Sequence, residues 1–223
     1  RQCAGSAGAQ SRQEPALVFT SLYPHVTDVG NLRACSDALP KDRAVGRDGV
    51  SKEAYGDNLE SNLQSLAERL RRMGYCPQPK RRVSIPKSGS EKGRPLGISC
   101  FEDKRVELAV KRVLEPIYEA VFEDRSFGYR PERNQHTGVD DLGRTVQQKR
   151  VSHIVEADIK SFFDEVNHDW MVQFLQHRIG DPRIIRLIGR MLKGGMLEEG
   201  LFRATEAGTP QGSIVSPLLS NIY

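Results

Sequence analysis

The stretch YCPQPKRRVSIPKSGSEKGRPLGI at 75–98 constrains the fold of this chain more than any other. Prolines and β-branched residues alternate with cations along it, and a proline inside a helix removes a backbone hydrogen bond. The pattern predicts a β-hairpin over 80–99 that turns at KSGSEKG, residues 87–93. Alternate side chains of a strand share one face, so such a ribbon presents its cations together.

Amphipathic helices are predicted on both sides of this ribbon. Residues 58–73 place apolar side chains at steps of three and four before Gly74, at Leu59, Leu63, Leu66, Leu70 and Met73. A second helix is predicted over 103–122, with Asp103 as its N-cap and a bend or split at Pro116. Its buried side is expected to contain Val106, Val110, Val113, Ile117 and Val121.

The remaining segments complete an α+β pattern. Residues 1–15 are small and polar, which predicts a flexible lead-in, whereas 151–160 is predicted to be a buried strand. A helix that begins near 168 is expected to end at Gly180, and Asp181 is expected to cap the next one. A short strand pair at 196–205 then leads through GTPQG to a last helix. Helices mixed with a hairpin and a single strand predict an α+β fold.

Charge is unevenly distributed along the chain. Nine Lys or Arg and one acid lie between Arg69 and Arg94, whereas five acids and one lysine lie in 154–170. A cluster of cations this dense favours polyphosphate or nucleic acid as a ligand. The alternative is an ordinary solvated face, which a run of charges alone does not exclude.

The acidic stretch contains one candidate metal ligand. If 151–160 is a strand, Glu156 and Asp158 point away from its apolar side, and Asp158 lies near its end. Magnesium prefers hard oxygen ligands, which the Asp158 carboxylate and the backbone carbonyl of Ile159 could supply. The later acids, Asp164, Glu165 and Asp169, stand where a helix begins, where acids also serve as caps.

Several classes of protein are not supported by the sequence. No apolar run approaches membrane-spanning length, and the first residues lack the pattern of a secretory signal. The four cysteines are irregularly spaced and predict neither a zinc site nor a disulfide framework, so a reducing cytoplasm is expected. The chain does not begin with Met and stops within an apolar segment, which is typical of a piece of a longer protein.

Six blocks of the sequence, in order, resemble the reverse transcriptase of group II intron-encoded proteins. The blocks are GRDGVS at 46–51, YCPQPKRRVSIPK at 75–87, RPLGISCFEDKRVELAVKRVLEPIYE at 94–119, SFGYRPERNQHTGV at 126–139, EADIKSFFDEVNHDW at 156–170 and GTPQGSIVSPLLSNIY at 208–223. The resemblance implies a right-hand polymerase, with fingers over 16–150 and the first part of a palm over 151–223. The family's catalytic YADD hairpin would follow residue 223.

The resemblance also assigns roles to single residues. Asp158, helped by the Ile159 carbonyl, would bind the two Mg²⁺ ions of a two-metal site whose other aspartates lie outside these residues. Phe163 would be the steric gate that excludes a ribose 2′-hydroxyl, while Phe162 is expected in the core. Gln211 and Gly212 would contact the incoming nucleotide, and Arg81, Lys87 and Arg94 its triphosphate. The other cations of the basic part are expected to contact RNA, namely Lys80, Arg82, Arg71 and Arg72.

The implied function is RNA-directed DNA synthesis by a bacterial, cytoplasmic intron-encoded enzyme. Its partners would be group II intron RNA, a template RNA, a DNA primer and deoxynucleoside triphosphates, and a homodimer is compatible with the resemblance. The protein would also act as a maturase that assists splicing, and these 223 residues alone are expected to be inactive. Two alternatives stay open: an RNA-binding splicing cofactor without polymerase activity, and a retron or CRISPR-associated reverse transcriptase.

Overall fold

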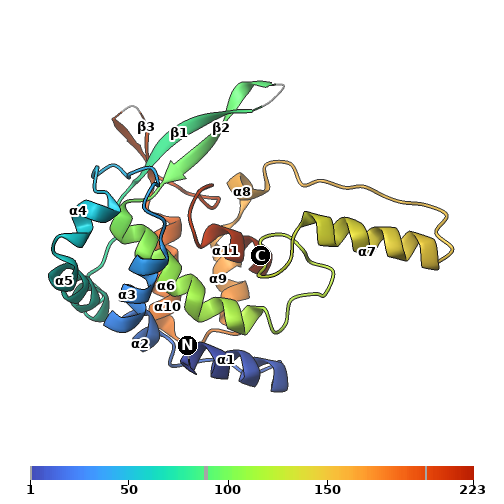
Figure 1. Cartoon of the computed structure of the whole chain (residues 1–223), viewed down its shortest axis with the longest axis horizontal. Helices are drawn as coiled ribbons and strands as arrows, with labels where there is room; N and C mark the ends of the chain where they lie inside the picture. Colours follow the sequence, from blue (N-terminus) through green and yellow to red (C-terminus); the bar gives the residue numbers. More distant parts are fainter. Residues whose placement is uncertain (1, 88–89, 199) are drawn as a thin grey trace.

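The computed structural model describes residues 2–87, 90–198 and 200–223 and has an α+β fold. Most helices gather around one long helix, and a small sheet rises from one side of this body (Figure 1). The elements are α1 Gln2–Gln13, α2 Tyr23–Val26, α3 Val29–Ala38, α4 Lys52–Gly56, α5 Leu59–Arg71, β1 Lys80–Lys87, β2 Ser90–Ile98, α6 Phe101–Tyr118, α7 Gln135–Gln148, α8 Phe162–Glu165, α9 His168–Gln176, α10 Pro182–Leu192, β3 Met196–Glu198, β4 Leu201–Arg203 and α11 Ser216–Ile222.

Helix α6 is the centre of the body, with α1, α2, α3 and α11 packed around it. The predicted apolar positions of this helix are buried, with the exception of Val121, which lies beyond its end and is 40% exposed. Two details of the prediction are wrong. The helix begins at Phe101, so Asp103 is a buried residue inside it and not its cap, and Pro116 is accommodated without splitting the helix.

The predicted hairpin is confirmed as β1 and β2, which pair antiparallel with Arg82 opposite Gly97. The central residues of its turn, 88 and 89, lie outside the described residues. The predicted strand pair at 196–205 is confirmed as β3 and β4, and β3 pairs with β1 in parallel. The sheet therefore has the order β2-β1-β3-β4 and joins segments more than a hundred residues apart.

The predicted flexible lead-in is wrong, because residues 2–13 form the helix α1 along α6. The buried hydroxyl of Ser11 donates to the Ile117 carbonyl at 2.8 Å and accepts a hydrogen bond from Arg178. The small residues that suggested disorder allow the two helices to approach closely: a Cβ on Gly8 would lie 3.1 Å from the Pro116 carbonyl oxygen. Small side chains are therefore a packing surface here.

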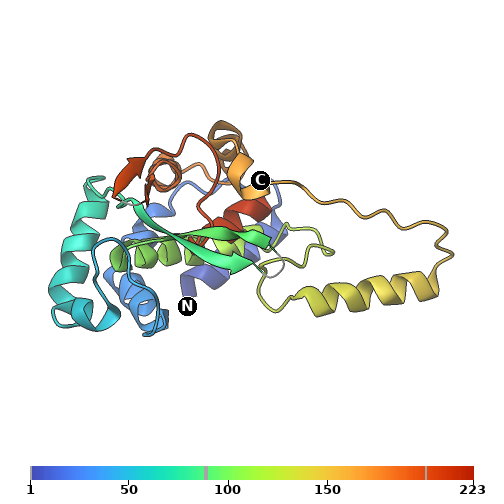
Figure 2. The ribbon, with the colours of Figure 1, turned by 90° about the horizontal axis from the view of Figure 1, so that it is seen from above.

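The prediction of a buried strand over 151–160 is also wrong. Every residue of the segment is exposed and none is assigned to a strand. With α7, which has no buried residue, the segment extends away from the body as an arm (Figure 2). A strand is stabilised by hydrogen bonds to a neighbouring strand. No described strand pairs with these residues, so alternation of side chains alone does not make them a strand.

The helices that follow the arm are close to the predicted ones. Helix α9 begins at the Asn167 cap, and Asp181 caps α10 by accepting from the Arg183 amide at 3.1 Å. The same carboxylate accepts from the amides of Leu22 and Tyr23, so it also fixes the beginning of α2. No helix among the described residues is long and apolar enough to span a bilayer.

Candidate nucleotide-binding site

The loop over residues 208–212 connects the hairpin to α8. The Gly97 amide of β2 donates to the Gln211 carbonyl at 2.7 Å, and the Thr209 amide donates to the Phe163 carbonyl at 2.7 Å. The Gly208 amide donates to the Val166 carbonyl, also at 2.7 Å. These backbone bonds hold Phe163 and Gln211 near each other, although the two residues are far apart in the sequence.

Two glycines make this close approach sterically feasible. Gly208 has φ +85°, and a Cβ on it would lie 2.8 Å from the carbonyl oxygens of Phe163 and Asp164. Gly212 has φ +100°, and its Cβ would lie 2.9 Å from the Gly97 carbonyl oxygen. Both conformations disfavour side chains. The close approach of Gly212 to strand β2 is thus one reason for a glycine here, and its contact with an incoming nucleotide stays a prediction.

A cleft with about 610 Å³ of open space lies between the hairpin, α8 and this loop. It is lined by Arg82, Pro95, Gly97, Phe163, Asp164, Met196, Thr205, Ala207, Gly208, Thr209, Pro210 and Gln211. The buried hydroxyl of Thr209 has no hydrogen-bond partner among the described residues. A buried hydroxyl usually has a partner, so the unpaired hydroxyl of Thr209 marks a polar position in the wall of the cleft.

The structure brings only some of the predicted site residues to this cleft. Phe163 and Gln211 line it, and Phe162 packs against the main core as expected. Arg82, assigned to RNA, also lines the cleft, where it forms an ion pair with Glu198 at 3.0 Å. The side chains of Lys87 and Arg94 lie outside the described residues.

The other cations are bound within the protein to different degrees. Arg81 donates from Nε and Nη2 to the Val45 carbonyl at 3.2 and 2.9 Å and does not line the cleft. Arg71 donates to the Thr27 carbonyl at 3.3 Å, and Arg72 pairs with Glu68 one turn earlier in α5. Arg71 and Arg72 are both exposed, so their predicted RNA contacts stay predictions.

Lys80 contradicts the prediction that it contacts RNA, because it is only 4% exposed. Its ammonium group pairs with the buried carboxylate of Glu107 in α6 and donates to Ser99 Oγ at 3.0 Å. The other Glu107 oxygen accepts from the Ile214 amide at 2.8 Å. This buried ion pair therefore links strand β1, helix α6 and the end of the loop that carries Gln211. Sequence periodicity placed Glu107 only on a helix and gave no signal of the pair.

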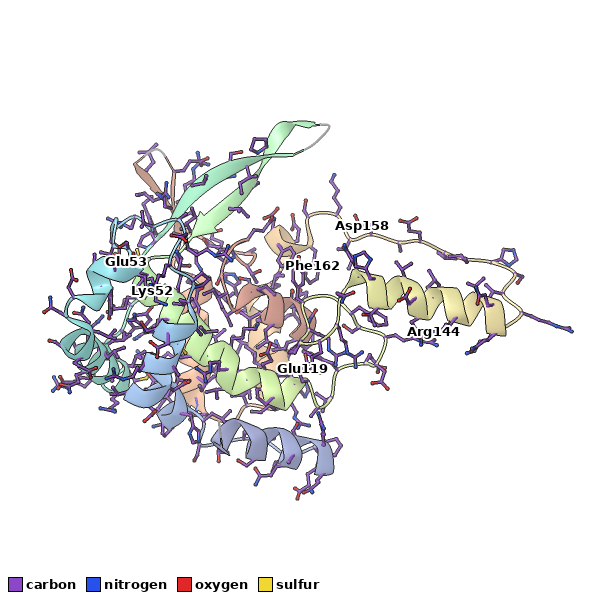
Figure 3. All side chains as sticks on the ribbon, in the orientation of Figure 1. Lys52, Glu53, Glu119, Arg144, Asp158 and Phe162 are labelled. Atoms are coloured by element: carbon purple, nitrogen blue, oxygen red, sulfur yellow. The ribbon has the colours of Figure 1, made fainter. Side chains whose placement is uncertain are left out.

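Asp158 lies on the exposed arm near α8 and does not line the cleft (Figure 3). No described residue forms a hydrogen bond or ion pair with its carboxylate. No group of three His, Cys, Asp or Glu among the described residues is arranged to hold a metal ion. One carboxylate and the Ile159 carbonyl do not satisfy the six-coordinate preference of Mg²⁺, so the residues described here do not by themselves form a magnesium site.

Sequence reasoning missed a buried acid next to the hairpin. Burial raises the pKa of Asp103 to about 7, although hydrogen bonds from the Tyr75 hydroxyl and the Gln78 amide oppose the shift. Burial also raises the pKa of Tyr75 well above its usual value, and the neighbouring Asp103 adds to this effect. The pair joins the segment before β1 to α6. An acid in the first turn of a helix normally indicates a cap, so the sequence carried no signal of this role.

Comparison with known proteins agrees with this architecture. Residues 85–223 match the family described as "Reverse transcriptase (RNA-dependent DNA polymerase)". The chain is 38% identical over 206 residues to the group II intron-encoded protein LtrA of Lactococcus lactis subsp. cremoris, which covers 92% of this chain and 34% of the relative. It is 41% identical over 184 residues to protein YkfC of Escherichia coli K12, which covers 79% of this chain and 47% of that protein.

A solved structure has the same fold. A chain of the partial Cas6-RT-Cas1–Cas2 complex superposes with a TM-score of 0.60 at 23% identity, over 90% of this chain and 33% of the other. The chain therefore has the polymerase fold of the reverse transcriptases. The chain belongs to the reverse transcriptase family, and the resemblance to its group II intron-encoded members is confirmed. It spans about a third of the length of the group II intron protein that it matches.

Proposed function

We propose that the protein containing these residues is the RNA-directed DNA polymerase of a group II intron, which copies intron RNA from a DNA primer. The observation that carries the proposal is the cleft in which Phe163, Gln211 and Arg82 meet beside the unpaired hydroxyl of Thr209. An aromatic ring, a side-chain amide and a guanidinium are groups suited to the sugar and phosphates of a nucleotide. Fingers at 16–150 and the first part of the palm at 151–223 are part of this proposal.

Within the cleft, Phe163 is the proposed steric gate and Gln211 the contact to the incoming deoxynucleotide. Arg82 is the cation best placed to meet its phosphates, with Lys87 and Arg94 of the same hairpin as further candidates. Arg81 joins them only if it releases the Val45 carbonyl. A guanidinium offers two parallel donors to phosphate oxygens, which favours arginine in this role.

Asp158 is proposed as one carboxylate ligand of the catalytic Mg²⁺. Magnesium stabilises the charge that develops on a transferring phosphoryl group. Since no metal cluster is formed among the described residues, the remaining ligands must come from elsewhere in the working complex. The Asp158 carboxylate is exposed and has no partner among the described residues, so it is free to take up such a ligand role.

The test is primer extension on an RNA template by the full-length gene product. Asp158→Asn is expected to abolish DNA synthesis, whereas Glu156→Gln, which removes a carboxylate from the same exposed segment, is expected to leave it intact. RNA binding by Asp158→Asn should equal that of the wild type. DNA synthesis at the wild-type rate by Asp158→Asn would refute the role of this residue, and a full-length protein without any synthesis would refute the polymerase proposal.

A second candidate function is splicing assistance through RNA binding, and it rests on a different surface. A hollow of about 280 Å³ beside Arg81 is lined by Lys41, Arg43, Lys52 and Lys104. The ammonium groups of Lys52 and Lys104 are bound to backbone carbonyls, whereas Lys41 and Arg43 are exposed and have no side-chain partner among the described residues. Such cations suit the phosphates of intron RNA.

Removing these two charges should separate the functions. Lys41→Met with Arg43→Met is expected to weaken intron RNA binding and to flatten its salt dependence, because about two phosphate contacts are lost. DNA synthesis on a saturating primer-template should persist. An unchanged salt dependence would exclude this surface.

A cytoplasmic location is also proposed, and it is supported by Cys35, Cys76 and Cys100, which are free thiols. Light scattering of the full-length protein would test the proposed homodimer.

A further inference from the structure

The backbone of Phe163 is fixed by a hydrogen bond, and its ring contacts two other aromatic rings among the described residues. The Thr209 amide binds its carbonyl, and its ring meets those of Phe162 and Tyr129 edge to face, with centroids 5.6 and 6.4 Å away. Phe162 is held in turn by the core and by the ring of Tyr223, 6.0 Å away. The ring of Phe163 therefore lies between a core residue and a residue of a distant loop.

Tyr129 is an unusual residue for such a position. It is 65% exposed, and its ring makes one aromatic contact in the described part of the chain, to Phe163. Its backbone has φ +57°, a left-handed conformation that is rare for bulky side chains and is found where surrounding contacts enforce it. The strain and the exposure are not explained by core packing, so a role at the gate residue is the better account.

Surrounding contacts do enforce this conformation. Arg130, whose side chain is 2% exposed, binds both carboxylate oxygens of Glu119 just beyond α6 (Figure 3) and donates to the carbonyls of Glu123 and Ser126 at 2.6 and 3.0 Å. On the other side of Tyr129, the Gly128 carbonyl accepts from the Asn221 side-chain amide of α11 at 2.9 Å. Tyr129 is thus anchored through both of its neighbours.

We propose that Tyr129 is a positioning residue that holds the ring of Phe163 toward the nucleotide sugar and thereby sets how strongly ribonucleotides are rejected. The inference rests on the proposed role of Phe163 as the steric gate. A gate excludes a 2′-hydroxyl only while its ring cannot move back to another rotamer. The rings of Tyr129 and Phe163 are in edge-to-face contact, with centroids 6.4 Å apart, so the ring of Tyr129 restricts movement of the ring of Phe163 toward it.

The test measures kcat/KM for a deoxynucleotide and for the matching ribonucleotide with the full-length protein. Tyr129→Ala is expected to lower the preference for the deoxynucleotide about two- to tenfold, which is the factor that an edge-to-face aromatic pair supplies. Tyr129→Phe should keep the wild-type preference, because no described residue binds the Tyr129 hydroxyl. Leu142→Ala, which removes another exposed apolar side chain, should also be neutral.

A double-variant comparison separates this inference from the proposed function. Phe163→Val should abolish most of the sugar preference, and adding Tyr129→Ala should then change nothing further. If Phe163→Val relaxes the preference and Tyr129→Ala does not, the role of Tyr129 is refuted and the proposed gate stands. If Phe163→Val has no effect, the gate and this inference both fail. A loss in Tyr129→Phe equal to that in Tyr129→Ala would also refute support by the ring. Thermal unfolding of each variant distinguishes these outcomes from misfolding.

Discussion

Replacing Glu107 by glutamine is predicted to destabilise the protein by about 3–5 kcal/mol, because the Lys80 ammonium would be left buried without its counter-charge. The two side chains are only 5% and 3% exposed, so water screens the lost charge weakly. Glutamine preserves the volume of Glu107 and retains one acceptor for the Ile214 amide, whose bond to the carboxylate is 2.8 Å. The predicted cost is therefore electrostatic and does not include a cavity.

The assay is reversible urea unfolding of the 223-residue chain, supported by thermal unfolding. For a domain of this size, a loss of about 3–5 kcal/mol lowers the Tm by about 6–20 °C. Hydrogen exchange at the Ile214 amide gives a local readout, and its protection should fall more than that of the α5 amides. Glu115→Gln is a matched control on the same helix, because its pair with Lys111 is partly exposed and should be worth about 0.3–0.5 kcal/mol.

A paired substitution tests whether the loss of stability comes from the unpaired charge of Lys80. Lys80→Met together with Glu107→Gln removes both charges, keeps an acceptor for the Ile214 amide and leaves only the Ser99 hydroxyl without its acceptor, at a cost of about 1–3 kcal/mol. The double variant should therefore be more stable than Glu107→Gln alone. A single variant within 1 kcal/mol of the wild type, or a double variant much less stable than the single one, would refute the assignment of the cost to an unpaired charge.

Three further predictions follow from other residues. The pKa of Asp103 is about 7 in the folded protein, compared with 3.8 for an ordinary aspartate. Between these two pH values the folded state holds a proton that the unfolded state has released, so stability should fall as the pH rises from 3.8 to about 7. Asp103→Asn cannot titrate, so its stability relative to the wild type should rise by about 1.4 kcal/mol per pH unit; a flat difference in urea unfolding would contradict the buried-acid assignment. Gly212→Ala should destabilise the protein by about 1–3 kcal/mol, measured by thermal unfolding, because Gly212 has a positive φ and lies against β2. Gly143→Ala, in open space on α7, should not destabilise the protein. Equal effects of the two substitutions would exclude backbone strain at Gly212. The 223-residue chain alone should give no Mg²⁺-dependent primer extension, and robust synthesis would show that its described residues suffice for metal binding.

The parts of the fold that the sequence predicted are those with local signals. Helix α5, the hairpin of β1 and β2 and the cap at Asp181 were each predicted from residues a few positions apart, and the structure confirms them. The family blocks were also informative about the site, because they named both Phe163 and Gln211, which meet in one cleft. Neither signal measures burial or pairing with distant segments.

The sequence by itself thus determined the α+β class, the family and the helices and hairpin whose periodicity repeats within a few turns. Only the tertiary structure decided that residues 151–160 are an exposed arm, that Lys80 is buried against Glu107, and that Tyr129 meets Phe163. The physical reason is that periodicity reports which side chains share a face of one element. Whether that face is buried, and whether a strand finds a partner, depends on contacts with residues far away in the chain, and these contacts exist only once it has folded.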